Sequence, residues 1–150
     1  MTYPATKAAI VVHAAAAGAA LADPILDARE GFPVPKDRCI RVYYAGETEP
    51  VRMGGNRVVN GELVSHRTLI ALFLPITDTD EYPASILDAE MFSFGHDFRT
   101  RILGDSQLGG ASTDLTLGYL EPDIVTYNNT RYLMGLWEII SDFVEYTLAP

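Results

Sequence analysis

The chain has 150 residues, 48% of them hydrophobic and 21% charged, which suits one globular domain and excludes a disordered segment. Its formal net charge of -9 excludes a protein that coats DNA through a basic surface. The single cysteine, Cys39, excludes an internal disulfide and fits a reducing compartment.

The N-terminal region predicts a helix. Residues 3–21 are rich in alanine, and Pro4 stands where a helix can begin. Lys7 precedes an apolar run, Ala8–Ala22, that also resembles the core of a secretory signal. Because His13 interrupts this run, we interpret it as a packed helix. The run is too short to span a bilayer, which needs about 20 apolar residues, so we expect no membrane association.

The next region predicts two strands. Asp23-Pro24 breaks the helix, and residues 25–30 favour one more helical turn. Residues 38–45 form the first predicted strand, and Cys39 within it is expected to be a buried, inert thiol. Residues 62–76 form a long second strand whose two faces are both apolar.

A small protruding hairpin is predicted between these two strands. Gly54-Gly55 is typical of a two-residue hairpin turn, and Asn60-Gly61 is a second signal of the same kind. Arginine is enriched at protein interfaces. The candidate interface residues here are Arg52, Met53, Gly54, Gly55 and Arg57. The alternative is that the two arginines are ordinary solvent-exposed residues that keep the turn soluble.

The second half of the chain predicts a helix and a long strand pair. Residues 84–103 favour a helix that Gly104 ends, with an apolar stripe formed by Ala84, Leu87, Met91, Phe94, Phe98 and Ile102. Leu115–Thr126 and Arg131–Leu148 predict two strands joined at Asn128-Asn129. Both faces of the last strand are apolar, so one face needs a second layer or a neighbouring subunit.

Together these elements predict a single α+β domain over residues 1–150. Helices alternate with antiparallel strand pairs along the chain, an order typical of this class. We expect a mixed, largely antiparallel sheet packed against two main helices, with the protruding hairpin at one side.

Gly104-Asp105-Ser106 resembles the nucleophile block of the GDS-type serine hydrolases. In that family the block follows a strand near the N-terminus and is paired with a downstream Asp-x-x-His. Here the block follows a predicted helix, and no histidine has an aspartate three residues before it. A helix-ending turn explains these three residues equally well.

Metal and cofactor motifs are also absent from the sequence. Asp78-x-Asp80 begins like a calcium loop, but Pro83 stands where the EF-hand needs glycine. The histidines His13, His66 and His96 are too far apart for a local zinc motif. We therefore expect no catalytic residue, no metal site and no cofactor, and interpret the chain as a protein that is not an enzyme.

With these elements placed, the chain resembles the tail terminator, or tail completion, proteins of long-tailed bacteriophages. The resemblance covers nearly the whole chain. It rests on size, element order, the strand from Arg67 to Leu74, the helix with Phe94 and Phe98, the glycine-rich loop 104–112 and the paired C-terminal strands.

The resemblance implies a structural virion protein that forms a hexameric ring on the head-proximal end of the tail tube. Such a ring ends tube growth and joins the tail to the head. The implied partners are further copies of the chain, the tail tube protein and a head-completion or neck protein. DNA would pass through the pore without specific binding. The implied location is the phage tail or neck, after assembly in the host cytoplasm.

We expect most interface residues on the Gly54-Gly55 hairpin, on the loop with Gly109 and Gly110, and on the C-terminal strand with Trp137 and Tyr146. Three alternatives stay open. One is another neck or connector subunit, and one is a hydrolase that uses Ser106. The third is a small-molecule-binding α+β module with a pocket between sheet and helix, lined by Tyr43, Tyr44, Phe94 and Trp137.

Overall fold

The structure is a computed structural model that describes residues 3–47, 51–53, 59–77, 85–105, 108 and 114–148. Within these ranges, residues 51–64, 114, 121 and 143–148 are described by their backbone alone.

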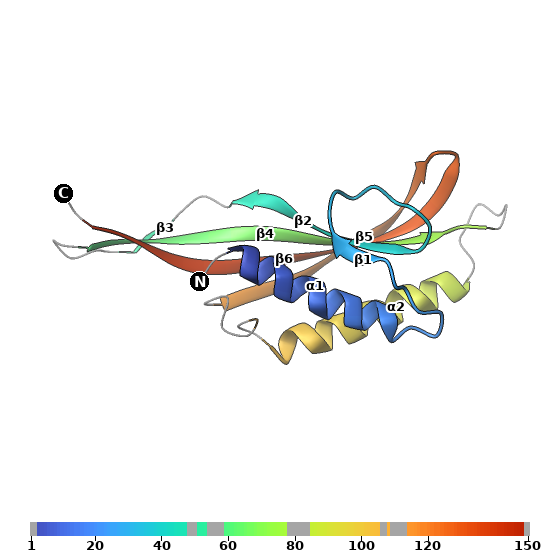
Figure 1. The fold of residues 1–150 in the computed structure, drawn as a ribbon, viewed down its shortest axis with the longest axis horizontal. Helices are drawn as coiled ribbons and strands as arrows, with labels where there is room; N and C mark the ends of the chain where they lie inside the picture. Colours follow the sequence, from blue (N-terminus) through green and yellow to red (C-terminus); the bar gives the residue numbers. More distant parts are fainter. Residues whose placement is uncertain are drawn as a thin grey trace.

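Two helices pack on one face of a six-stranded sheet (Figure 1). The helices are α1 (Tyr3–Ala19) and α2 (Ser85–Leu103). The strands are β1 (Ala28–Glu30), β2 (Cys39–Glu47), β3 (Val51–Met53), β4 (Val59–Pro75), β5 (Asp114–Tyr127) and β6 (Thr130–Leu148). Their order is β1-β2-β4-β6-β5, with β3 also paired to β4, and only the β1–β2 pair is parallel. The predicted α+β class with a mixed, largely antiparallel sheet is confirmed.

One of the two predicted turns near β3 needs correction. Asn60 and Gly61 lie inside β4, where Gly61 pairs with Met53, so the hairpin turn expected there is wrong. Residues 54–58 lie outside the described residues, and with them the tip of the predicted protruding hairpin.

The helical turn expected over residues 25–30 is also wrong, because Ala28–Glu30 forms β1. The Arg41 side chain is 4% exposed and donates hydrogen bonds to both carboxylate oxygens of Asp27, at 2.9 and 2.8 Å. The Ile40 backbone N–H donates to the Asp27 carbonyl at 2.9 Å. This tertiary anchoring holds the segment extended, since a helical turn would move the Asp27 carboxylate away from Arg41.

Small residues let α1 lie close to the sheet. Ala14, Ala17 and Gly18 are buried, and a Cβ atom built on Gly18 would stand 2.7 Å from the Ile40 Cδ1 atom. On α2, the predicted stripe is confirmed for the described residues, with Met91, Phe94, Phe98 and Ile102 buried. Both helices therefore fill one continuous core with the inward side chains of the sheet.

The second face of the sheet is covered in part by the chain itself. The connection from β1 to β2 lies on the side away from the helices (Figure 1), and its Pro35 is buried. Beneath it is a small core of Cys39, Ala71, Phe73 and Tyr132. Burial raises the pKa of the Cys39 thiol, as expected for an unreactive core residue. The sheet is therefore apolar on both faces, as the sequence predicts.

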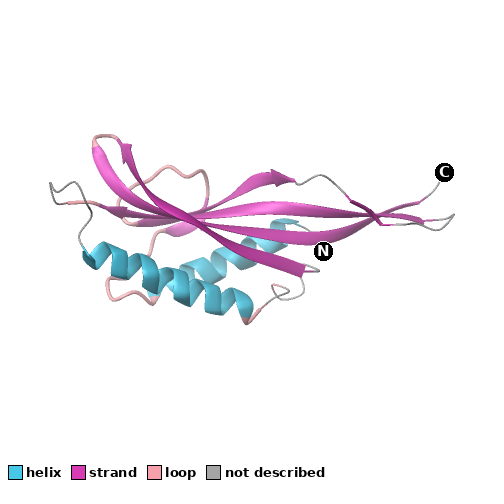
Figure 2. Cartoon of the chain, turned by 180° about the vertical axis from the view of Figure 1, so that it is seen from behind, coloured by secondary structure: helices cyan, strands magenta, loops and turns pink. Residues whose placement is uncertain are grey.

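Strands β4 and β6 pair without interruption from Val59↔Leu148 to Pro75↔Tyr132. Figures 1 and 2 show this pair extending well beyond the helices toward the C-terminus. We call residues 59–65 and 142–148 the β4–β6 arm. At the far end, Asn128 and Asn129 join β5 to β6 with φ of 48° and 62°. Both angles are left-handed, as a type I′ hairpin turn requires, so the predicted Asn-Asn turn is confirmed.

The Asp27–Arg41 contact predicts a pH-dependent contribution to stability. Hydrogen bonding from Arg41 holds the pKa of Asp27 below its ordinary value. Because the folded-state pKa is lowered, the contribution is complete above about pH 4 and is lost as pH falls through the lowered pKa. We expect Asp27→Asn to lower the free energy of unfolding at pH 7 by about 1–2 kcal/mol, since Asp27 is partly solvated.

Urea denaturation of both proteins from pH 7 down to pH 3 measures this effect. The difference between wild type and Asp27→Asn should shrink toward acid pH. A difference that stays constant across this range would contradict the assignment. Asp123→Asn, at an exposed carboxylate bonded only to the next backbone N–H in the described structure, is the control.

Candidate functional site

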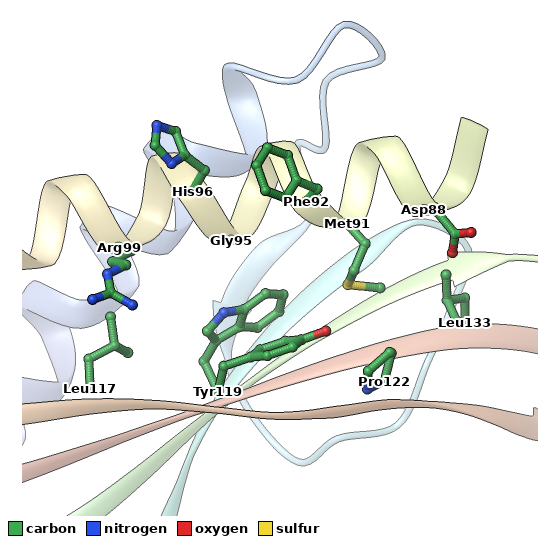
Figure 3. A pocket seen from close by; sticks show the side chains of 11 residues that line it. Asp88, Met91, Phe92, Gly95, His96, Arg99, Leu117, Tyr119, Pro122 and Leu133 are labelled. Carbon is green, nitrogen blue, oxygen red and sulfur yellow. The ribbon is translucent and has the colours of Figure 1, made fainter. Parts of the chain in front are cut away.

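A pocket of about 560 Å³ lies between α2 and the strands β5 and β6 (Figure 3). Its lining is mostly apolar and aromatic, with charged side chains at the rim. The lining residues are Asp88, Met91, Phe92, Gly95, His96, Arg99, Leu117, Tyr119, Pro122, Leu133 and Trp137. Size and lining are those of a binding pocket, since such sites are concave and predominantly apolar.

Trp137 forms the floor of this pocket. Its side chain is 4% exposed and packs edge-on against Phe94 and Phe98, with ring centroids 4.9 and 6.5 Å away. From β5, the Tyr119 ring lies 5.2 Å from it in a tilted arrangement. Aromatic rings in such edge and tilted contacts support one another, so the floor is a rigid surface.

Two glycines make room for the Trp137 ring. A Cβ atom on Gly95 of α2 would stand 2.9 Å from the Trp137 Cζ2 atom. A Cβ atom on Gly135 of β6 would stand 2.8 Å from the Trp137 Cη2 atom and would also collide with the Met91 sulfur. The Trp137 indole therefore occupies the space that a side chain at position 95 or 135 would need, so both positions require glycine.

The rim of the pocket is unusually exposed. Phe92 is 74% exposed and stacks on His96, with ring planes 11° apart and centroids at 6.0 Å. Tyr119 is 52% exposed. A partner that covered these rings would remove a large apolar area from water.

Opposite charges stand at the two ends of the pocket. In Figure 3, Arg99 points toward Leu117 at one end and Asp88 lies near Leu133 at the other. Neither charged side chain forms a salt bridge within the described part of the chain. Both charges are exposed and free to meet a partner of opposite sign.

The structure brings together only part of the four-residue pocket that the sequence suggested. Trp137 lines the pocket and Phe94 is buried beneath it. Tyr43 packs with the Cys39 core on the other face of the sheet. The Tyr44 ring packs against the rings of Tyr3 and His66, with centroid distances of 4.8 and 5.8 Å. Tyr43 is not a pocket residue because it faces the side of the sheet away from the helices. Tyr44 faces the helix side but packs beside Tyr3 of α1, whereas the pocket lies between α2, β5 and β6.

The predicted interface residues are distributed along the sheet. Arg52 and Met53 lie in β3, and Tyr146 lies in the arm, paired with Gly61. Trp137 is buried in the pocket floor rather than presented on the surface. Outside the described residues lie Gly54, Gly55, Arg57, Gly109 and Gly110, together with Ser106, Asp78 and Asp80.

The histidines lie in separate surroundings. His13 on α1 contacts the Asp105 carboxylate at 2.9 Å, and His66 contacts the Tyr44 hydroxyl at 3.2 Å. His96 stacks on Phe92. Among the described residues, no three His, Cys, Asp or Glu side chains converge as a metal site would require.

Sequence reasoning missed the exposed half of the pocket. The signal available was Phe92, a large aromatic that lies beside the buried stripe of α2 and not within it. Tyr119 and Pro122 gave a second signal. Pro122 lies where the β5–β6 register shifts between Leu120 and Asp123, a position typical of an edge strand.

Comparison of the chain with protein-family models gives no match, and a search of curated proteins gives none either. Among the described residues, no helix is both long enough and apolar enough to cross a bilayer.

Packing around Trp137 predicts a contrast between two strand glycines. Gly135→Ala places a Cβ atom against the Trp137 ring, so we expect a loss of about 1–3 kcal/mol in the free energy of unfolding. Gly118→Ala, on neighbouring β5, meets no atom closer than the Glu138 carbonyl at 4.0 Å. Its effect should stay within about 0.5 kcal/mol. Urea unfolding measures the free energy of unfolding of both variants. An equal loss in the two would refute the packing assigned to Trp137.

Proposed function

We propose that this chain is a structural virion protein of a long-tailed bacteriophage, a tail terminator. It works as a ring of identical copies at the head-proximal end of the tail tube, where it ends tube growth and joins the tail to the head. Its partners are the tail tube protein and a head-completion or neck protein. DNA passes through the ring without specific binding.

The β4–β6 arm is the observation that carries this proposal. The two strands stay paired from Ser65↔Asp142 out to Val59↔Leu148, beyond the helices (Figures 1 and 2). β3 pairs with β4 along this stretch, from Val51↔Leu63 to Met53↔Gly61, so the arm is a sheet of two to three strands. Among the described residues no helix lies over it, and so small a sheet needs a packing partner to be stable in water. An arm of this kind gains stability when a neighbouring subunit packs against it, which favours an assembling protein over a self-contained enzyme.

Charge supports the same proposal. The chain carries 20 acidic and 11 basic residues. A negatively charged ring discourages DNA from adhering as it slides through the pore, because the phosphates are repelled. The runner-up within this class is another neck or connector subunit, which would use the same arm in a different ring.

The proposal predicts a closed ring in solution or on its template. We expect sedimentation across a concentration series to show a discrete oligomer, and negative-stain images to show rings of six copies. Added to purified tail tubes, the protein should bind at one end and stop elongation. A chain that stays monomeric and leaves tube growth unchanged would refute the proposal.

A variant without the arm is the matched comparison. Glu47 of β2 pairs with His66 of β4, so an Asn-Gly turn can join these strands after removal of residues 48–65. The variant also ends after Asp142. We expect it to keep the Trp137 emission of the wild-type core and to lose ring formation. An armless variant that still forms rings would show that the arm is dispensable.

A second candidate function is a small-molecule-binding module, favoured by the volume and aromatic floor of the pocket. Aromatic carboxylates would fit best, with their rings near Tyr119 and Phe92 and their charge near Arg99. Under this alternative, such compounds raise the melting temperature of wild type and not of Arg99→Glu. An unchanged melting temperature across a panel of aromatic acids would exclude it.

A further inference from the structure

The connection between β1 and β2 carries an exposed apolar knob. We call residues 31–37 the Phe32 loop. Phe32 is 84% exposed and Val34 is also exposed, whereas Pro35 is buried and anchors the loop. The Val34 backbone N–H donates to the Phe32 carbonyl at 2.7 Å, and a proline follows each of the two exposed residues. The loop is therefore held rigid, which reduces the entropy lost when Phe32 is bound.

The knob and the pocket lie at opposite edges of the same sheet. The Phe32 loop follows β1, the first strand in the sheet order, and the pocket borders β5, the last. Phe32 lies near Arg41, on the face away from the helices, whereas the pocket is on the helix side. A protein with complementary features on opposite sides can join head to tail with copies of itself.

We propose that the Phe32 loop of one copy seats in the α2–β5 pocket of the next copy. This inference rests on the proposed self-assembly and names a second contact between copies, beside the one made by the β4–β6 arm. Phe32 would enter beside Phe92 and Tyr119, over the Trp137 floor. Each copy then gives one knob and receives one, so the contact is heterologous and repeats until a ring closes.

Charges flanking the two features are complementary. Lys36 and Asp37 stand at the end of the Phe32 loop, and Asp88 and Arg99 stand at the two ends of the pocket. None of the four side chains forms a salt bridge within the described part of the chain. Asp88 and Arg99 stand about 16 Å apart along α2, so the adjacent Lys36 and Asp37 meet one end of the pocket in a given docking, with Lys36 near Asp88 or Asp37 near Arg99. For a chain with a net charge of -9, such pairing sets this contact apart from random encounters.

The edge strand favours this mode of contact over strand pairing. Pro122 lacks an N–H group, and the register shift between Leu120 and Asp123 interrupts the β5 edge. A neighbour's strand would find no regular ladder there. Side-chain docking into the pocket avoids this obstacle, and it covers the exposed rings of Phe92 and Tyr119 that an isolated small ligand would leave partly in water.

Disulfide trapping between copies tests the contact directly. Phe32→Cys protein is mixed with Phe92→Cys protein and oxidised, with Cys39 kept because it is fully buried. We expect a covalent dimer. The matched control replaces Phe92→Cys by Leu103→Cys, an exposed residue of α2 that does not line the pocket. The double variant Phe32→Cys/Phe92→Cys should give a ladder whose largest species reports the ring size.

Complementation distinguishes a head-to-tail contact from a symmetric one. Phe32→Asp removes the apolar side chain that docks, and Phe92→Asp alters the pocket that receives it. Both residues are exposed, so both variants should still fold. Each variant alone should self-associate about 30-fold more weakly, as expected when an interface hot spot is lost. In a mixture, Phe92→Asp protein still carries an intact Phe32 loop and Phe32→Asp protein still carries an intact pocket, so a 1:1 dimer should form.

Trp137 provides an internal reporter, because it is the only tryptophan of the chain. Its emission should shift to shorter wavelength as wild type assembles, because the docked loop replaces water in the pocket beside the ring. The same shift in Phe32→Asp should need about 30-fold more protein. If Phe32→Asp protein forms rings as readily as wild type, and no disulfide forms between positions 32 and 92 of neighbouring copies, this contact is wrong. The proposed ring itself would then still stand. Trapping at these positions without tube capping would support the contact and count against the tail-terminator function.

Discussion

The pairing of β4 with β6 is the constraint on which the rest of the molecule depends. Each strand presents apolar side chains on both faces, and the ladder keeps one register along its whole length. A shift by one residue would exchange the two faces, moving Trp137 and Ile70 out of the helix-side core. The two helices, the β1–β2 connection and the edge strand β5 are all placed by this one ladder.

The ladder is longer than the layer that covers it. Where helices and sheet overlap, the core is closed by Phe94, Phe98 and the inward residues of β2, β4 and β6. Beyond the helices the same two strands continue as the β4–β6 arm (Figures 1 and 2). The helices therefore cover one part of the ladder and leave the arm outside them, and the proposed assembly would use this second part.

The α2–β5 pocket and the Phe32 loop lie toward the two edges of the sheet. The pocket exists because Gly95 and Gly135 let the indole of Trp137 lie between helix and strand, which leaves open space beneath Phe92 and Tyr119. The Phe32 loop exists because Arg41 holds the Asp27 segment against β2 and the chain must then cross the second face of the sheet. Both features follow from packing that the domain needs for its own stability, and both leave aromatic surface exposed.

Sequence reasoning succeeded where local pattern and chain direction decide the structure. The stripe of Met91, Phe94, Phe98 and Ile102 identifies α2, and Asn128-Asn129 identifies the turn between β5 and β6, because only certain residues accept left-handed φ. It failed at Asn60-Gly61 and at residues 25–30, where long-range contacts override local preference. The β4–β6 ladder keeps Asn60-Gly61 extended, and the buried Arg41 does the same for β1.

The α+β class, the main helices and strands, and the apolar character of both sheet faces can be read from the sequence alone. These properties follow from side-chain periodicity, which is local. What covers each face and where the pocket opens depend on contacts between distant parts of the chain. Trp137, Phe92 and Tyr119 come from three different elements, and no pattern along the chain encodes their meeting. Their positions depend on strand order and helix placement, which arise from the packing of the whole domain at once.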